Sequence, residues 1–222
     1  MTSHDVVAIA RRSMGIKKIG HCGTLDPMAT GLLMLVVGRA TKIQDLLMSE
    51  DKEYVGTVTL GKTTSTQDAE GEVVEENEVP ELSDDEVRAA FDKFTGEFEQ
   101  IPPMVSAIKK DGVPLYKLAR KGKEVKRDPR PVYVTSYELS RIEVPEIDFT
   151  VKCSKGFYVR TYAHDIGREL GCGGHLSSLR RTRSGKFTLD RSVKIDTLKN
   201  AGAEELINSM VSLAEISLMR GA

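Results

Sequence analysis

One carboxylate lies in a setting that suits a reactive group. Asp26 occupies the segment Gly20-His-Cys-Gly-Thr-Leu-Asp-Pro-Met-Ala-Thr-Gly31, whose glycines and proline predict a loop. Pro27 fixes its own φ angle and restricts Asp26 to extended conformations. A predicted buried strand over residues 32–37 would anchor this loop while Asp26 stays open to a substrate. Local chemistry alone favours the plainer alternative that Asp26 forms a turn, because Asp-Pro commonly begins one.

Histidine and cysteine do not form a metal-binding pattern in this sequence. Cys172-Gly-Gly-His175 has no second pair at the spacing of a zinc site, and the other histidines are scattered. We therefore expect no metal, which disfavours a metal-dependent hydrolase, and we interpret residues 171–174 as a helix stop and a turn. Three cysteines are too few for a disulfide framework, so we expect reduced thiols and a cytoplasmic protein.

The elements that must position Asp26 do not follow a regular strand-helix-strand order. Apolar periodicity and capping signals predict helices from the capping box at Ser83 and over residues 3–14, 40–48, 115–120, 162–170 and 203–218. Strands are predicted over residues 32–37, 54–60, 132–139, 147–153 and 157–161. This order predicts an α+β fold with a mixed, largely antiparallel central sheet flanked by helices.

Length and composition describe a globular protein. The chain has 222 residues, of which 40% are apolar and 29% charged, a balance that excludes the disordered and membrane classes. At about 150 residues per domain we expect a single domain over residues 1–222, or one domain with a small appendage. No window approaches the roughly 20 apolar residues of a membrane span, and residues 1–12 lack the apolar core of a signal peptide.

The formal net charge of −1 hides an asymmetric distribution of charge. Residues 45–104 contain 17 acidic and 4 basic side chains. By contrast, residues 109–131 contain 9 basic and 3 acidic ones, and residues 152–194 contain 10 basic and 3 acidic ones. If both basic segments lie on one face, that face would hold a polyanion such as RNA. The alternative for any one run of charge is an ordinary solvated surface.

The run His21-Cys-Gly-Thr-Leu-Asp-Pro-Met-Ala-Thr-Gly-Leu-Leu33 closely resembles the catalytic motif of the TruB-type tRNA pseudouridine synthases. Other segments match in the same order over about residues 1–195, and several co-linear motifs are far more specific than one loop. They are Asp51-Lys-Glu-Tyr54, residues 61–71, Gln100-Ile-Pro-Pro-Met-Val-Ser-Ala-Ile-Lys109, residues 115–122, Cys153-Ser-Lys-Gly-Phe-Tyr-Val-Arg-Thr161 and residues 171–182. Thr24-Leu-Asp26 also differs from the Arg-Leu-Asp or Arg-Ala-Asp of the ribosomal-RNA branches.

The resemblance implies an isomerase that converts a uridine of the tRNA T loop, position 55, to pseudouridine. The glycosidic N1–C1′ bond breaks, the uracil turns within the pocket, and C5 bonds to C1′. The resemblance implies no metal, nucleotide or redox cofactor. It implies the tRNA T stem-loop as the partner and no obligatory protein partner, so we expect a cytoplasmic monomer.

The resemblance also assigns catalytic roles. Asp26 is the catalytic carboxylate, which acts on the sugar, on the base or on a ribose proton, and Arg160 pairs with it to keep it ionised. If residues 157–161 form a strand, Tyr158 faces the same side as Arg160, and its hydroxyl assists proton removal from C5. Without the resemblance, a Tyr-Val-Arg strand would more simply be a surface pair.

Substrate contacts follow by the same resemblance. Tyr54 stacks on the uracil, which helps offset the cost of unstacking the nucleotide, although its alternative is a core residue at a strand start. His21 lies beside the flipped nucleotide, and Leu179 covers the base. Phosphate contacts are expected from Lys42, Lys109, Arg180 and Arg181.

Two departures from the usual family pattern bear on function. Met1-Thr-Ser3 aligns with the end of a longer Asp-Lys-Pro-x-Gly-Met-Thr-Ser segment, so we expect a catalytic domain that is short at its N-terminus. The residues after Leu218 are too few for the small C-terminal RNA-binding domain of bacterial relatives, so we expect none. The alternative hypothesis is an RNA-binding or tRNA-folding protein that has lost its chemistry with the missing segment.

Overall fold

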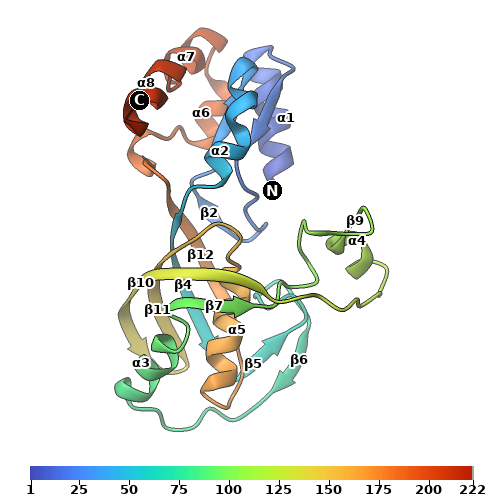
Figure 1. Ribbon diagram of the computed structural model, residues 1–222, viewed down its shortest axis with the longest axis vertical. Helices are drawn as coiled ribbons and strands as arrows, with labels where there is room; N and C mark the ends of the chain where they lie inside the picture. Colours follow the sequence, from blue (N-terminus) through green and yellow to red (C-terminus); the bar gives the residue numbers. More distant parts are fainter. Residues whose placement is uncertain (222) are drawn as a thin grey trace. The chain divides into compact units, whose positions relative to one another are not determined.

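The computed structural model describes residues 1–221 (Figure 1). Its contacts divide the chain into two compact units. The first unit comprises residues 1–52 together with the chain from Arg180 onward, and the second comprises Glu53–Leu179. Within residues 1–221, no helix is both long and apolar enough to cross a membrane.

Helix α1 (Ser3–Met14) begins and ends at strong local signals. Thr2 caps its N-terminus in a reciprocal box with Asp5, and each side chain accepts a hydrogen bond from the other residue's backbone. Gly15 ends the helix with a left-handed backbone, which glycine adopts without steric cost. The helix predicted over residues 3–14 is confirmed at both ends.

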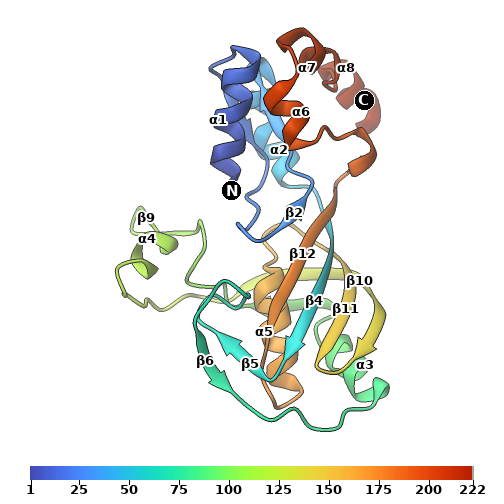
Figure 2. The same cartoon turned by 180° about the vertical axis from the view of Figure 1, so that it is seen from behind.

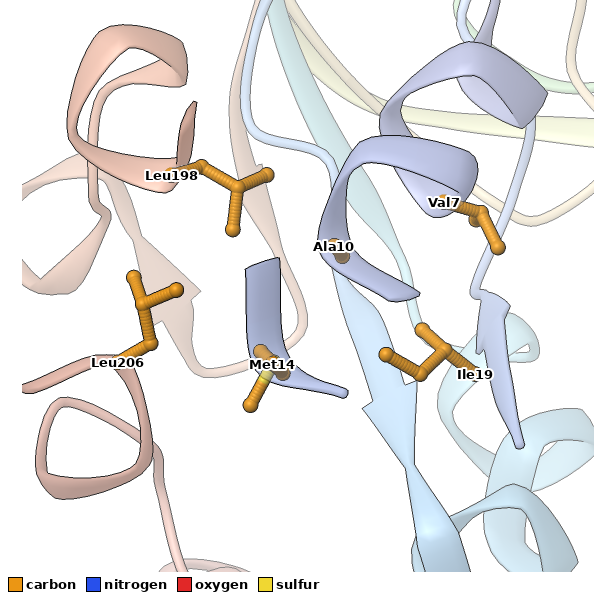
Figure 3. Packing of buried hydrophobic residues seen from close by; sticks show 6 residues of the cluster. All are labelled: Val7, Ala10, Met14, Ile19, Leu198 and Leu206. Carbon is orange, nitrogen blue, oxygen red and sulfur yellow. The ribbon is translucent and has the colours of Figure 1, made fainter. Parts of the chain in front are cut away.

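The inner face of α1 supplies the core of the first unit. It packs against β1 (Ile19–His21), α6 (Ile195–Asn200) and α7 (Ala203–Asn208). The buried cluster, drawn in Figure 3, consists of Val7, Ala10, Met14, Ile19, Leu198 and Leu206. Because β1 pairs antiparallel with β3 (Leu35–Val37), both flanks of the Asp26 segment are tied to this core.

The remaining elements of the first unit are short. The helix predicted over residues 40–48 is a 3-10 helix followed by an α-helix, and the one predicted over 203–218 is broken into two. The break follows because Ser212 forms a capping box with Glu215 and starts a new helix. These elements are β2 (Thr30–Gly31), η1 (Gly38–Ile43), α2 (Gln44–Met48), β13 (Phe187–Thr188), η2 (Leu189–Arg191) and α8 (Leu213–Arg220).

The second unit contains the main sheet, and the predicted α+β class is confirmed. Its strands lie in the order β12-β4-β11-β10-β7, and β10 pairs antiparallel with both β11 and β7. They are β4 (Lys52–Leu60), β7 (Gly96–Gln100), β10 (Arg130–Glu143), β11 (Glu146–Cys153) and β12 (Gly174–Ser184). The last residues of β12, from Arg180, belong to the first unit, where they pair with β2 and β13.

Helices α3 (Asp84–Asp92) and α5 (Val159–Glu169) pack on one face of this sheet (Figure 2). Phe149 of β11 contacts Phe91 of α3 and Tyr162 of α5, each with ring centroids 5.9 Å apart. Phe91 and Tyr162 also contact each other edge to face at 5.7 Å. The three rings therefore join both helices to the sheet.

Two excursions leave the main sheet. The hairpin β5 (Lys62–Thr64) and β6 (Val73–Glu76) forms the first. The second, which both views show reaching away from the sheet, carries β8 (Lys109–Lys110), β9 (Val113–Pro114) and α4 (Leu115–Ala119) (Figures 1 and 2). The second excursion carries most of the first basic segment.

One strand prediction was wrong, and two strands of the main sheet, β7 and β12, were missed. The strand predicted over residues 157–161 does not form: α5 begins at Val159, and Tyr158 is its N-cap residue. Alternation over five positions is too short to exclude a helix, and Tyr162 and Ile166 continue a helical period from Val159. Strand β12 was not predicted, because its charged second half hides the apolar pattern.

Two tyrosines contact Phe91, and removal of their hydroxyl groups should change the free energy of unfolding in opposite directions. Tyr162 is fully buried, and its hydroxyl has no hydrogen-bond partner among the described residues. Tyr137 of β10 donates to the carboxylate of Asp92 (2.6 Å) and to the carbonyl of Arg88 (3.2 Å). We predict that Tyr162→Phe raises the free energy of unfolding by up to about 1 kcal/mol, whereas Tyr137→Phe lowers it by about 1 kcal/mol.

Urea unfolding of the two variants beside the wild type measures this difference. Both lose one oxygen next to the same ring, so each is the control for the other. A loss of stability in Tyr162→Phe equal to that in Tyr137→Phe would contradict the prediction.

Candidate active site

The Asp26 loop, residues 22–31, leaves β1 with its backbone anchored. Cys22 donates its N–H to the carbonyl of Met34 at 2.9 Å. Inside the loop, the Ala29 N–H bonds to the carbonyl of Asp26 at 2.9 Å, which closes the turn expected of Asp-Pro. Asp26 is half-buried on this anchored loop.

Two other elements of the first unit hold the Asp26 loop from outside. At the N-terminus of α1, the Ser3 hydroxyl accepts the N–H of Leu25 at 2.9 Å. At the end of β12, the Arg181 carbonyl accepts the N–H of Leu32 at 2.8 Å. The residue before Asp26 and the residue after the loop are thus both bonded to regular elements.

His21 ends β1 next to this loop. Its ring contacts that of His4 edge to face, with centroids 5.2 Å apart and planes at 82°. Burial lowers the pKa of His21, and the positive charges of His4 and Arg181 lower it further. A histidine with a depressed pKa is neutral near pH 7, so it adds no positive charge beside the loop.

Cys22, the first residue of the loop, has an unreactive thiol. Its side chain is fully buried, and burial raises the pKa of the thiol to about 11. The thiolate that a nucleophile or a metal ligand requires is therefore scarce at neutral pH. Among residues 1–221, no group of three or more His, Cys, Asp or Glu side chains is arranged to hold a metal ion.

Arg160 is the central charged group of the second unit. It lies in the first turn of α5 and is only 3% exposed. Its guanidinium donates to the carbonyls of Thr66 and Val105, each at 2.8 Å. The Nε atom lies 3.6 Å from a carboxylate oxygen of Asp68. These hydrogen bonds hold the guanidinium in place between two irregular segments of the second unit.

Asp68 is a site residue that the sequence analysis missed. It is 3% exposed, and its Oδ1 atom accepts from the Thr66 hydroxyl (2.6 Å) and the Glu70 N–H (3.0 Å). These bonds leave the other oxygen toward Arg160. Its position inside the matched segment 61–71 was a signal that it has a role, but only the structure shows which cation it accompanies.

Tyr158 is oriented by a second missed residue. Gln100 is buried, and its side-chain amide makes two bonds to the Tyr158 backbone: the oxygen accepts its N–H (2.8 Å) and the nitrogen donates to its carbonyl (3.1 Å). Because Tyr158 is the N-cap of α5, this pair fixes the entry to the helix that carries Arg160. Gln100 lay in a matched segment but received no role.

The other predicted site residues are spread over both units. In the second unit, Tyr54 lies on β4 and is half-buried, Leu179 on β12 is 6% exposed, and Lys109 on β8 is exposed. In the first unit, Lys42 on η1 and Arg180 on β12 are exposed. The roles predicted for these five residues stay predictions.

Arg181 departs from the expected phosphate contact. Its side chain is 1% exposed, and its guanidinium donates to the carbonyls of Leu32 (2.7 Å) and Gly23 (3.3 Å). A guanidinium buried this deeply does not reach phosphate at the surface. Neighbouring residues on a strand point to opposite sides, which explains why Arg180 is exposed and Arg181 is not.

The sequence matches two family models. Residues 11–159 match the TruB family pseudouridylate synthase (N terminal domain), and residues 160–218 match the tRNA pseudouridylate synthase B C-terminal domain. The tRNA pseudouridine synthase B of Opitutus terrae is 53% identical over 210 residues, which cover 95% of this chain and 87% of the relative. That of Geobacter sulfurreducens is 49% identical over 96% of this chain and 70% of the relative.

Solved structures agree with the fold. One chain of a structure described as a Cbf5-Nop10-Gar1 complex is similar with a TM-score of 0.70 and 30% identity over 94% of this chain. This chain covers 55% of that one, so it spans about half the length of the solved chain it matches. The likeness supports the pseudouridine synthase type of α+β fold.

The lowered pKa of His21 predicts how stability depends on pH. The unfolded state binds more protons than the folded state below the usual histidine pKa of 6.5, so the free energy of unfolding falls as pH drops through that value. The half-buried His164, whose pKa is also lowered by burial, contributes with the same sign. We expect His21→Gln to make the free energy of unfolding depend less steeply on pH.

Urea unfolding between about pH 8 and about pH 5.5 measures this slope, and NMR titration of His21 measures the pKa itself. Removing the charge of its neighbour by His4→Gln should raise that pKa only part of the way, because burial is the larger cause. Titration of His21 above 6.5 in the wild type would contradict the prediction.

Proposed function

The chain belongs to the TruB family of pseudouridylate synthases, and from this membership we propose that it isomerises the T-loop uridine of tRNA, position 55, to pseudouridine. The observation that supports the proposal most strongly is the Asp26 loop. It lies in the part of the chain that the family model matches, and it presents one half-buried carboxylate on an anchored backbone.

The reaction conserves every atom of the nucleotide. The N1–C1′ bond breaks, the uracil turns, C5 bonds to C1′, and the proton on C5 is exchanged for one on N1. No electron enters or leaves, so the chemistry calls for acid–base groups rather than a redox cofactor. Asp26 supplies the ionised carboxylate, Tyr158 the hydroxyl that assists loss of the C5 proton, and Arg160 the cation.

The target uridine lies within a folded RNA loop, so it must leave its stack before it reacts. Tyr54 stacks on the flipped uracil, which recovers about 1–3 kcal/mol of the unstacking cost. His21, neutral because of its depressed pKa, lies beside the nucleotide, and Leu179 covers the base.

The partner is the T stem-loop of tRNA, held by phosphate contacts. Lys42, Lys109 and Arg180 are exposed cations suited to that role, and the excursion around α4 adds exposed lysines. We further propose one catalytic domain that acts as a cytoplasmic monomer. Its three cysteines are free and buried, which suits a reducing compartment.

We predict that Asp26→Asn lowers the single-turnover rate constant by about 10³-fold or more, because the amide cannot replace an ionised carboxylate, while the T stem-loop still binds. The rate is measured as tritium released from a stem-loop whose uridine is tritiated at C5. Asp196→Asn, on the exposed surface of α6, is the matched control and should keep the wild-type rate.

Release of tritium by Asp26→Asn at the wild-type rate would defeat the assignment of Asp26. A wild-type protein that binds the stem-loop but releases no tritium would favour the RNA-binding alternative.

Lysines of the α4 excursion should carry part of the RNA affinity. Lys117, Lys121 and Lys123 are exposed, and we predict that changing all three to Gln raises the Kd for the T stem-loop. The slope of log K against log salt should shrink by about 0.7–0.9 for each lost phosphate contact. Filter binding over a salt series gives both quantities.

A second triple variant serves as the control. Lys62, Lys93 and Lys152 are paired with glutamates of the second unit, so their change to Gln should leave the salt slope as it is. Equal slopes for the two triple variants would show that the α4 excursion does not contact phosphate.

A further inference from the structure

We infer that Arg181 is a positioning residue that anchors both ends of the Asp26 loop and thereby holds the Asp26 carboxylate in its reactive place. The inference deepens the proposed function, on which it rests, and it gives Arg181 a role different from the phosphate contact expected from sequence. Its evidence lies wholly within the first unit.

The side chain of Arg181 bridges the two ends of the loop. Nε donates to the carbonyl of Leu32, just after the loop, at 2.7 Å. A terminal nitrogen donates to the carbonyl of Gly23, the second residue of the loop, at 3.3 Å. One rigid guanidinium plane therefore ties together two backbone points on either side of Asp26.

The backbone of Arg181 adds a second anchor at the far end. Gly31 of β2 is paired in parallel with Arg181, and the Leu32 N–H bonds to the Arg181 carbonyl. A Cβ atom placed on Gly31 would lie 2.2 Å from that carbonyl oxygen, and the φ angle of Gly31 is +95°. The loop end thus lies directly on the strand, closer than any residue with a side chain allows.

Among the described residues, the buried guanidinium of Arg181 donates to the carbonyls of Gly23 and Leu32, at the two ends of the loop. A guanidinium that is 1% exposed must be met by hydrogen-bond acceptors, because an unmet buried charge is strongly destabilising. The carbonyls of Gly23 and Leu32 meet this need only while the loop keeps its observed path. The buried cation therefore favours one loop conformation over others.

The test compares Arg181→Met and Arg181→Lys with Arg183→Met, an exposed arginine on the same strand. We expect Arg181→Met to lower the single-turnover rate at saturating stem-loop by about 100-fold, since a small misplacement of a reacting group has that effect. The Kd should change by less than about threefold, and Arg181→Lys should recover part of the rate. Arg183→Met should match the wild type in both.

Cys22 reports on the loop independently of activity. Its buried thiol should resist iodoacetamide in the native wild type and in Arg183→Met. In Arg181→Met, we expect native-state labelling of Cys22 to rise at least about tenfold, because the released loop opens more often. This readout holds even if the chain proves to have no synthase activity.

The inference would be overturned if Arg181→Met had a raised Kd with a smaller salt slope, an unchanged rate and an unlabelled Cys22. That result would support the phosphate contact expected from sequence. If neither Arg181 variant gives a cooperative melting transition, exchange of the Arg181 Nε–H in the wild type decides the question by NMR. Exchange nearly as slow as that of the core amides supports the anchor. Exchange as fast as that of an exposed arginine overturns it.

Discussion

A buried guanidinium must have its donors satisfied, and two arginines impose this constraint on the loops of the protein. Arg160 and Arg181 are 3% and 1% exposed, and each donates to the backbone carbonyls of two loop residues. Regular elements, α5 and β12, carry the cations, while irregular segments supply the acceptors. The loops are ordered because the charges are buried.

This arrangement explains how the irregular Asp26 loop can hold its carboxylate in one place. The Asp26 loop has no regular structure over most of its length, yet hydrogen bonds to Ser3 of α1, to Met34 and to Arg181 of β12 hold its backbone. In the proposed isomerisation, such preorganisation would let the Asp26 carboxylate meet a flipped nucleotide without further adjustment. In the proposed function, the exposed cations have a different task, which is affinity for the RNA backbone.

Local signals predicted the starts of some helices, but the capping box at Ser212 was overlooked. The box at Ser83 sets the start of α3 as expected, and α1 begins at Ser3 as expected, with Thr2 as its cap. The short segment around Tyr158 failed, because five alternating residues fit a strand and a helix start equally well. Asp68 and Gln100 were not assigned a role from sequence, because their own segments do not indicate that they contact Arg160 and Tyr158.

The sequence by itself determined the family and the α+β class and proposed Asp26 as the candidate carboxylate, because each of these depends on contiguous motifs or on the order of elements. Only the tertiary structure decided which member of the Arg180-Arg181 pair is buried and what it holds. Strand alternation separates the two side chains but does not say which side faces the protein. That choice depends on contacts such as the one between Arg181 and Leu32, which are 149 positions apart in the chain.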